Sequence, residues 1–350
     1  MSNKILIVTG EHDSTADLMV LHLADRGVAF ERFHPQDLPR DATVTVRFGP
    51  NHPPEGRMTT LGTPIDWSEI AAVWYRRPQA FSLSTGLGAE EREFAFHECT
   101  AVTQGMWRSF DAFWVNHPDR IRIAESKPLQ LTLAGRLGFR LPRTLFTNDP
   151  GEVRALWDAC GGAIVYKSMT QGVLGQSVQK SVYTNRVTAE HLARADLLRN
   201  APGLFQEEIP KAADLRITVV GERLFPIEIR SQTDPDALVD WRRGAVPNMA
   251  HVPCTLPAEV ERACLALNRR LGLHYSAIDM VLTPDGEHVF LEINPSGQFG
   301  WIESVTGLPI IETLADLLLD GARRGLVDRP ICDPPPARAA SEVEREKATS

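Results

Sequence analysis

The segment Ile278–Asn294, IDMVLTPDGEHVFLEIN, decides how the fold is interpreted. Each half alternates apolar and polar residues, and Pro284-Asp285-Gly286 between them is a turn signal, so the segment predicts a β-hairpin. A register that pairs Ile278 with Ile293 gathers the apolar side chains on one face. The apolar pairs expected in that register are Ile278–Ile293, Met280–Leu291 and Leu282–Val289.

The same register sets two carboxylates, Asp279 and Glu292, directly opposite each other on the second face, with Asn294 two residues farther along. Like charges in this position destabilise a sheet unless a cation lies between them. Mg²⁺ prefers such oxygen ligands and commonly uses one or two carboxylates together with substrate phosphates. The pattern therefore favours a magnesium site. The rigid turn Asn294-Pro295-Ser296-Gly297 supports this interpretation, because it fixes the position of the Asn294 side-chain amide. The alternative is a solvated hairpin face with two unrelated acids.

A second hairpin is predicted at Asp214–Arg230, DLRITVVGERLFPIEIR. With a three-residue loop, Asp214 faces Arg230 and Arg216 faces Glu228 on the face opposite the apolar pairs. One interpretation is a salt-bridged surface, worth about 0–1 kcal/mol per exposed pair. The other is a cleft wall whose arginines bind phosphate oxygens with their planar guanidinium groups. The charge pattern alone leaves both open.

Three further features would complete a nucleotide site. Lys167 ends the β-rich run Ile164–Tyr166, and Lys127 stands at the start of a predicted helix. Lysines are usually exposed surface residues, which is the alternative for both. Leu204–Pro210 predicts an extended segment whose backbone N–H and C=O groups can bind an adenine edge.

Composition excludes several classes of protein. The chain has 350 residues, with 37 Lys and Arg against 45 Asp and Glu, and a net charge of −8 that argues against a protein coating nucleic acid. Its apolar runs are far shorter than the roughly 20 residues of a membrane helix, and no signal peptide is evident. The 5 cysteines form no C-x-x-C pair, which predicts neither disulfides nor a zinc site and fits the cytoplasm. The common phosphate-binding, zinc-protease and serine-hydrolase motifs are absent.

Taken in order, these residues resemble the ATP-grasp enzymes. The series is Lys127, Lys167, Gln206-Glu207-Glu208-Ile209, Asp214-x-Arg216-x-x-Val219-Val220-Gly221, Asp279 and Glu292-x-Asn294. Among them the chain is most similar to the ribosomal peptide maturases of the graspetide (microviridin-type) macrocyclase family. The stretches that carry this similarity are Val73–Pro78, Phe113–Pro118, Ser126–Asn148, Asp214–Gln232 and Asp240-Trp241-Arg242, within residues 1–325.

The resemblance implies an α/β (α+β) architecture, with the ATP-grasp fold preceded by a small α/β pre-ATP-grasp domain. The expected domains are residues 1–118 for the first and 119–330 for the ATP-grasp domain. The latter divides into a central and lid part, 119–205, and a C-terminal part with the metal site, 206–330. Residues 331–350 are expected to form a disordered tail, because they are rich in Pro, Ala and charge.

The resemblance also implies the role of each site residue. Lys127 and Lys167 would hold ATP phosphates, Glu207, Glu208 and Ile209 would bind adenine, Asp214 would contribute to nucleotide binding, and Asp279, Glu292 and Asn294 would bind Mg²⁺. Arg216, Arg230 and Arg242 would be catalytic residues near the phosphates or the acyl-phosphate, and Arg76, Arg77 and Trp241 would contact the peptide. The loop Thr170–Gln176 would close over the triphosphate. No general base is identified, and Asp214 and Glu228 are only candidates.

The activity implied is an ADP-forming ligase that joins Asp or Glu side chains of a ribosomal precursor peptide to Ser or Thr hydroxyls or Lys amines. The expected partner is that peptide, leader and core, with no nucleic acid and no membrane, and a homo-oligomer is left open. Two alternatives remain. One is an ATP-grasp ligase that adds amino acids such as glutamate to a terminus. The other is a nucleotide-binding regulator without turnover.

Overall fold

The computed structural model describes residues 4–50, 52–60, 62–169 and 183–328. It has a mixed α/β architecture and divides into two compact units, each assembled from separate stretches of chain. Unit 1 comprises Met1–Glu11, Ala29–Asp119 and Leu318–Ser350, and unit 2 comprises His12–Val28 and Arg120–Leu317.

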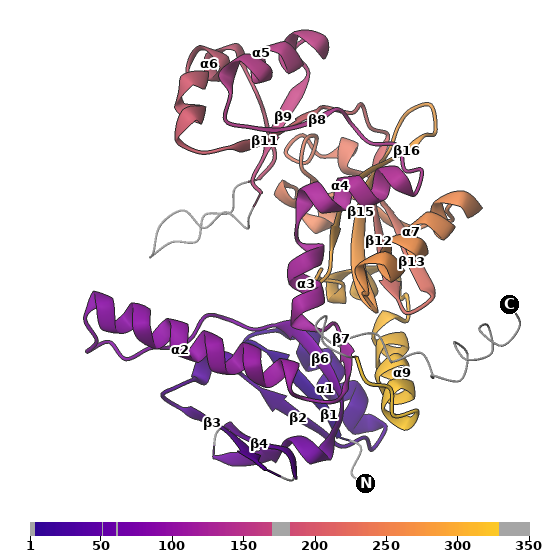
Figure 1. The fold of residues 1–350 in the computed structure, drawn as a ribbon. Coiled ribbons are helices and arrows are strands. Elements are labelled where there is room, and N and C mark those ends of the chain that lie inside the picture. The colour runs from indigo at the N-terminus through magenta and orange to yellow at the C-terminus, as the bar shows by residue number, and fades with distance from the viewer. Residues whose placement is uncertain (1–3, 51, 61, 170–182, 329–350) are drawn as a thin grey trace, which may run out of the picture. The chain divides into compact units, whose positions relative to one another are not determined.

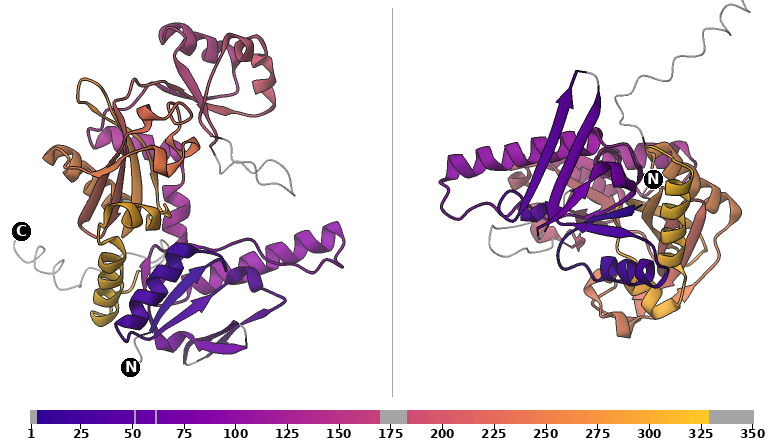
Figure 2. Two further views of the ribbon diagram at one scale, coloured as in Figure 1. Left: turned by 180° about the vertical axis from the view of Figure 1, so that it is seen from behind. Right: turned by 90° about the horizontal axis from the view of Figure 1, so that it is seen from below.

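Unit 1 is built on a parallel sheet of strand order β2-β1-β6-β7. Residues Ile5–Val8 of β1 are completely buried, as expected of a parallel strand covered on both faces. A three-stranded antiparallel sheet, β3-β4-β5, and the long helix α2 complete the unit (Figures 1 and 2). The bounds are β1 (Lys4–Thr9), β2 (Phe30–Phe33), β3 (Ala42–Gly49), β4 (His52–Thr60), β5 (Thr63–Asp66), β6 (Ile70–Arg77), α2 (Ala89–Arg108) and β7 (Phe113–Val115), with short 3₁₀ turns η1 (Pro35–Asp37) and η2 (Trp67–Glu69).

Unit 2 contains a smaller antiparallel sheet, β10-β9-β11-β8, with α5 and α6 beside it. Asp149 caps α5 by accepting from the Gly151 amide at 2.8 Å, and Pro150 is the first helical residue, a position that proline favours. The bounds are β8 (Thr144–Thr147), α5 (Pro150–Ala159), β9 (Ile164–Lys167), β10 (Asn185–Arg186), α6 (Ala189–Ala193), η3 (Ala195–Asn200) and β11 (Gly203–Glu207).

The larger sheet of unit 2 is antiparallel, in the order β14-β13-β12-β15-β16. Helices α4 and α7 pack on one face, where Leu215, Ile217 and Val219 of β12 contribute to the apolar core. The strands are β12 (Ala213–Val220), β13 (Arg223–Ile229), β14 (His251–Pro253), β15 (Tyr275–Leu282) and β16 (His288–Asn294). The remaining helices and turns of the chain are α1 (Ser14–Asp25), α3 (Pro118–Ala124), α4 (Lys127–Arg136), η4 (Ser231–Thr233), η5 (Trp241–Arg243), η6 (Val246–Asn248), α7 (Ala258–Leu271), α8 (Gly300–Thr306) and α9 (Ile310–Arg323). The boundary between the units falls within α3 and α9, so the start of α3 and the end of α9 belong to unit 1.

The hairpin β15–β16 confirms the pairing of Ile278 with Ile293 and of Asp279 with Glu292. Beyond Asp279 the register shifts at a β-bulge, because Leu291 is an extra residue in β16. The predicted partners farther along are therefore wrong. Met280 pairs with Phe290 and Leu282 pairs with His288, not Met280 with Leu291 and Leu282 with Val289.

The hairpin β12–β13 is present, but its predicted register is wrong by one residue. Val220 pairs with Arg223, so the loop holds only Gly221 and Glu222, and Gly221 takes the positive φ of +58° that a tight turn accommodates. Asp214 and Arg216 consequently lie opposite the apolar residues of β13 and not opposite Arg230 and Glu228. Such a slip by one residue changes the face on which every partner side chain lies.

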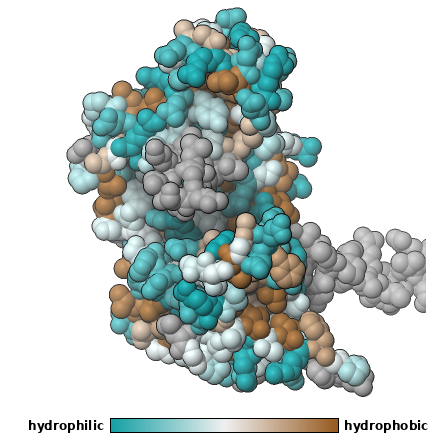
Figure 3. Space-filling model, turned by 90° about the vertical axis from the view of Figure 1, so that its left-hand side faces the viewer, coloured by the Kyte–Doolittle hydropathy of each residue, from teal (hydrophilic) through white to brown (hydrophobic). Residues whose placement is uncertain are grey.

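In the part of the chain that the structure describes, no helix combines the length and apolar character needed to cross a membrane. On the face drawn in Figure 3, hydrophobic residues are scattered among hydrophilic ones outside the grey atoms.

Candidate functional site

A row of charged residues crosses three neighbouring strands of the larger sheet. Arg216 on β12 lies opposite Asp279 on β15, which lies opposite Glu292 on β16. Arg216 Nη1 donates to both carboxylate oxygens of Asp279, at 2.8 and 2.9 Å. Glu292 forms an ion pair with Lys127, the first residue of α4. Each of the two facing carboxylates therefore has its own cation.

Helix α4 is fixed beside β16 by a pair of hydrogen bonds. Gln130, buried one turn after Lys127, donates to the Ile293 carbonyl at 2.9 Å and accepts from the Ile293 amide at 3.2 Å. Because Ile293 is the neighbour of Glu292, this contact holds Lys127 and Glu292 at a fixed separation.

The loop after β16 wraps around Arg216. Arg216 Nη2 lies 3.4 Å from the Gln298 carbonyl, and Asn294 Oδ1 accepts from the Ser296 amide at 2.9 Å. A Cβ placed on Gly297 would lie 2.6 Å from Arg216 Nη2 and 2.5 Å from the Ala277 side chain. Only glycine fits at this position without displacing the guanidinium group.

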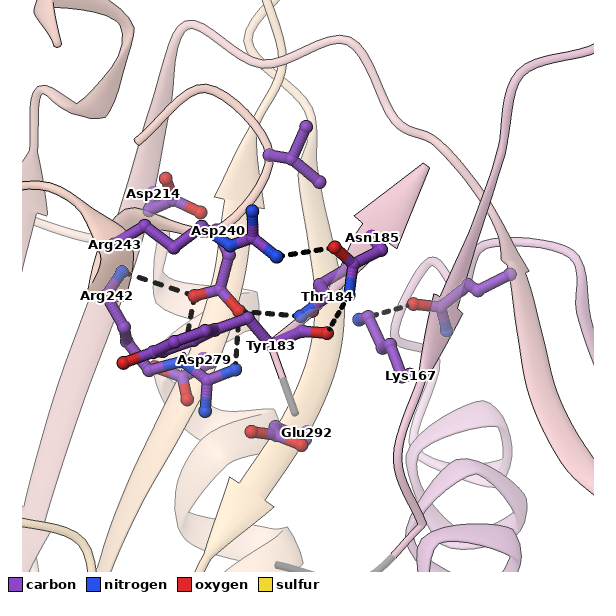
Figure 4. Close-up of polar contacts among 12 residues, drawn as sticks. Lys167, Tyr183, Thr184, Asn185, Asp214, Asp240, Arg242, Arg243, Asp279 and Glu292 are labelled. Atoms are coloured by element: carbon purple, nitrogen blue, oxygen red, sulfur yellow. Dashed lines mark hydrogen bonds and ion pairs between the residues drawn. The ribbon is translucent and has the colours of Figure 1, made fainter. Parts of the chain in front are cut away.

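Lys167, the last residue of β9, brings a second ammonium group to the site (Figure 4). Its Nζ donates to Gln206 Oε1 at 2.6 Å, and Gln206 Nε2 in turn donates to Thr144 Oγ1 at 2.9 Å. Burial lowers the pKa of Lys167 to about 8, although the nearby Glu292 carboxylate acts in the opposite direction. Lys167 is therefore a desolvated cation, a state that a bound anion would stabilise.

A fourth cationic group, after Arg216, Lys127 and Lys167, comes from η5. Arg242 donates to Asp240 through Nε at 2.8 Å and through Nη2 at 2.6 Å. Asp240 also accepts from the Thr184 amide at 3.0 Å, which ties η5 to the chain just before β10 (Figure 4). The guanidinium groups of Arg242 and Arg243 lie 5.9 and 5.3 Å from the ring centre of Tyr183.

The electrostatic environment separates the protonation behaviour of the two facing carboxylates. Burial alone would raise the pKa of Glu292, but Lys127, Lys167 and Arg242 outweigh it and hold that pKa at about 2. Burial raises the pKa of Asp279, with Arg216 opposing the rise and the Glu292 charge adding to it. Asp240 has a pKa of about 2, because the contacts with Arg242 outweigh its burial. Glu292 is thus a strongly stabilised anion.

These residues fit Mg²⁺ held jointly with nucleotide phosphates. Among the described residues there is no group of three His, Cys, Asp or Glu side chains that could bind a metal without help. Asp279, Glu292 and the Asn294 amide instead offer oxygen ligands that need phosphate oxygens to complete the coordination. Arg216 Nε is buried and has no hydrogen-bond partner in the described part of the chain, so it retains a donor for an anion. Lys127, Lys167 and Arg242 add positive charge around Glu292.

Other residues singled out in the sequence lie elsewhere. Arg230 pairs with Glu228 at 3.0 Å and is more than half exposed. Asp214 is buried, where it accepts from Ser231 Oγ at 2.5 Å and pairs with Lys211 at 2.9 Å. In this structure Asp214 therefore anchors η4 to the start of β12.

The segment expected to bind adenine begins at Glu207, the last residue of β11. The amides of Glu207 and Glu208 donate to the carbonyls of Arg143 and Ala163, each at 2.9 Å. The Glu208 side chain pairs with Arg186 at 2.7 Å. With those two amides used inside the sheet, the Ile209 backbone is the better candidate for an adenine edge.

The residues expected to contact a peptide are divided between the units. Arg76 and Arg77 end β6 in unit 1, where Arg76 is buried near the Trp74 ring and Arg77 is exposed. Trp241 belongs to unit 2 and stacks on Trp301, with ring centres 5.3 Å apart. The loop Thr170–Gln176 and the tail 331–350 lie outside the described residues.

Sequence reasoning gave no site role to four residues that organise this site: Gln130, Gln206, Asp240 and Gly297. The last three were quoted only as parts of longer motifs. A Gln directly after the apolar pair Leu204-Phe205 of a predicted extended segment was a signal for Gln206, and an Asp two residues before an Arg is typical of a capping side chain such as Asp240. Gln130 carries no local signal, because its partner Ile293 is 163 residues away. Gly297 lies in a turn that the sequence predicts, but its close approach to Arg216, 81 residues away, has no local signal.

Comparison with known families and structures gives consistent matches. Residues 4–122 match the family model described as the MvdD pre-ATP grasp domain. The chain is 33% identical to the macrocyclase MdnC of Microcystis aeruginosa MRC, solved with its precursor peptide MdnA. That match has a TM-score of 0.81 and covers 91% of this chain and 99% of the other.

A second solved structure is similar over nearly the whole chain. It is a RiPP-associated ATP-grasp ligase of Chryseobacterium gregarium in complex with ADP and a leader and core peptide. The identity is 31%, the TM-score is 0.85, and the match covers 94% of this chain and all of the other. Among curated proteins, a probable alpha-L-glutamate ligase of Pseudoalteromonas translucida is 24% identical over 72% of this chain and 81% of its own length.

Proposed function

This chain belongs to the ATP-grasp macrocyclase family, and from that premise we propose that it closes rings in a ribosomally made precursor peptide. The chain is an ADP-forming ATP-grasp ligase that uses ATP and Mg²⁺. Its substrate groups are Asp or Glu side-chain carboxylates, joined to Ser or Thr hydroxyls or to Lys amines.

The chemistry has two steps. The peptide carboxylate attacks the γ-phosphorus of ATP, which gives an acyl-phosphate and releases ADP. The hydroxyl or amine then attacks the acyl carbon, loses its proton and displaces inorganic phosphate, which leaves an ω-ester or ω-amide. The peptide loses one water per ring.

The row Arg216–Asp279–Glu292 is the observation that carries the proposal. Asp279, Glu292 and Asn294 would hold Mg²⁺, which supplies Lewis-acid neutralisation of phosphate charge when bound. Lys127 and Lys167 would bind phosphate oxygens. Phosphoryl transfer depends mainly on such positioning and charge stabilisation.

The arginines would act on the transferred group. Arg216 keeps an unused Nε donor in the site, and its planar guanidinium group is suited to phosphate oxygens. Arg242 interacts electrostatically with the carboxylates of Asp279 and Glu292 and would contact the acyl-phosphate. Arg230, which is more than half exposed, would also act near the transferred group. Arg76, Arg77 and Trp241 would contact the peptide.

The nucleotide base and the cellular setting complete the proposal. Glu207, Glu208 and Ile209 would flank adenine, with Asp214 supporting the adjacent strand. We place the reaction in the cytoplasm, where ATP and newly made peptides occur, without nucleic acid or membrane as partners.

The glutamate-ligase alternative is less supported. The curated ligases of that name are less similar to this chain than the peptide-modifying macrocyclases, and they match a smaller part of it. The relatives described above are named ligases and macrocyclases, which favours an enzyme over a regulator without turnover.

The test is incubation of the protein with ATP, MgCl₂ and MdnA, or with a short Thr/Ser- and Asp/Glu-rich peptide encoded beside its gene. Loss of one water mass per ring together with ADP formation supports the macrocyclase. A mass increase by a glutamate residue, with free glutamate present, supports the glutamate ligase and contradicts the proposal.

A further inference from the structure

A half-buried aromatic cluster lies beside Arg242 and is not used by the proposed chemistry. Trp241 and Trp301 have ring centres 5.3 Å apart with an interplanar angle of 38°. His251 meets the Trp301 ring edge-on at 5.2 Å. All three side chains are only partly exposed. We call these three residues the aromatic platform.

The two tryptophan rings of the aromatic platform belong to elements that are held in place. Trp241 begins η5, whose turn is fixed by Asp240 accepting from the Arg242 amide at 3.2 Å and from its side chain. Trp301 belongs to α8, which is anchored by the completely buried Phe299 and Ile302. Rigid, preorganised rings lose little entropy when a ligand binds to them.

The sheet register places the aromatic platform on the reactive face. His251 lies opposite Ile229 on β13, which lies opposite Asp214 on β12. Residues directly opposite share a face of a sheet, as do residues two apart on one strand, so His251 is on the same face as Arg216. Asp279, opposite Arg216, is on that face too.

The position of Trp241 next to Arg242 in the chain indicates which part of a bound peptide would lie near its ring. Its neighbour Arg242 lies near Asp279 and Glu292 and is assigned above to the acyl-phosphate. An extended peptide advances about 3.3 Å per residue, so residues next to a carboxylate held at Arg242 lie within reach of the Trp241 ring. His251 Nε2 is a buried atom without a hydrogen-bond partner among the described residues, and it suits a peptide backbone group.

We propose that Trp241, Trp301 and His251 form the subsite for an apolar or aromatic side chain that flanks the activated carboxylate of the substrate peptide. This inference rests on the proposed function and deepens it, because it assigns a residue preference to the same site. Aromatic rings favour flat or apolar partners over glycine and serine. The aromatic platform is thus a specificity-determining surface.

The experiment uses the precursor peptide that the wild-type enzyme modifies, together with versions in which each residue flanking the modified carboxylate is replaced by Phe or by Gly. With wild type, we expect the Phe versions to have a KM about 10-fold lower than the Gly versions, at similar kcat. Trp241→Ala and Trp301→Ala should remove this difference, and Trp241→Phe should restore most of it.

Two controls separate the outcomes. Phe48→Ala removes an exposed aromatic ring in unit 1 and should leave the preference intact. Stabilisation of each Trp variant by MgATP should match that of wild type, which shows an intact nucleotide site.

Peptide modification by wild type that is indifferent to the flanking residue would overturn the aromatic platform and leave the proposed function standing. Equal losses for all peptides in the Trp variants would also overturn it, since that is the result of a structural role. Absence of any ring formation, with glutamate added to the peptide, would overturn the proposed function itself.

Discussion

Glu292 is the side chain on which the cations of the site converge. Lys127, Lys167 and Arg242 together hold its pKa at about 2, against its burial. Glu292→Gln keeps the shape but removes the charge and a metal-ligand oxygen. We expect ADP formation to fall by about 100-fold or more, with the fold retained.

The measurement is ADP release with circular dichroism as the check on folding. Glu287→Gln is the matched control, because Glu287 precedes the same strand, is half exposed and pairs with Arg140. Full activity of Glu292→Gln would contradict the metal assignment.

Lys167 gives a prediction about pH. Its pKa is lowered to about 8 by burial, whereas in the unfolded chain it has an ordinary value near 10.5. Between these values the unfolded chain binds the extra proton, so this lysine makes wild type more stable as pH rises from 8 to 10.5. Below pH 8 the buried charge destabilises the fold, and Lys167→Met removes that cost.

The stability gain of Lys167→Met over wild type should therefore shrink as pH rises through this window. Urea unfolding at pH 7 and pH 10 measures the change, and comparing the two proteins cancels the other titrating groups. MgATP should stabilise wild type more than Lys167→Met. A difference between the proteins that does not vary with pH would contradict the assignment of a desolvated ammonium group.

At the scale of elements, the sequence predicts the hairpins but not their exact registers. Alternation alone placed Asp279 opposite Glu292, because pairing the apolar residues Ile278 and Ile293 sets their neighbours opposite each other. It could not show the bulge at Leu291, and it could not choose between a two- and a three-residue loop at Gly221. Those choices depend on packing against other elements. The pairing of Arg216 on β12 with Asp279 on β15 joins two different hairpins, so alternation within either hairpin could not predict it.

The turn at Gly221 can be tested directly. Its φ of +58° disfavours a side chain, and a Cβ there would lie 3.4 Å from Leu317. Gly221→Ala should lower the free energy of unfolding by about 1 kcal/mol. Gly221→Asn should lose less, since Asn tolerates this backbone region better than Ala. Urea unfolding of both variants checks the order, and equal stability of Ala and wild type would argue against the two-residue turn.

At the scale of the whole molecule, charge is distributed unevenly. The chain carries a net −8, yet its candidate site gathers Lys127, Lys167, Arg216 and Arg242 around Asp240, Asp279 and Glu292. The overall charge argues against a nucleic-acid coat, and the local excess of cations suits an anionic nucleotide and a carboxylate-bearing peptide. Composition predicted the first point, and only the assembled sheet brings together the residues for the second.

The division of the chain into units could not be predicted from the sequence. A linear scan finds boundaries at proline-rich segments, but unit 2 takes His12–Val28 from near the N-terminus and unit 1 takes residues from Leu318 onward. Such exchanges depend on long-range contacts that leave no local compositional signal. The residues proposed to bind the nucleotide and the metal nevertheless all belong to unit 2.

That placement predicts which amides MgATP protects. A ligand that binds only the folded state stabilises it by about 2.7 kcal/mol at 100 times its dissociation constant, or about 100-fold in slow hydrogen exchange. We expect this protection in β9, β11, β15 and β16 of unit 2, and little change in β1 and β6 of unit 1. ATP with EDTA is the control and should protect these strands less. Equal protection of the strands of both units would mean that the units unfold as one, and protection confined to unit 1 would contradict the site.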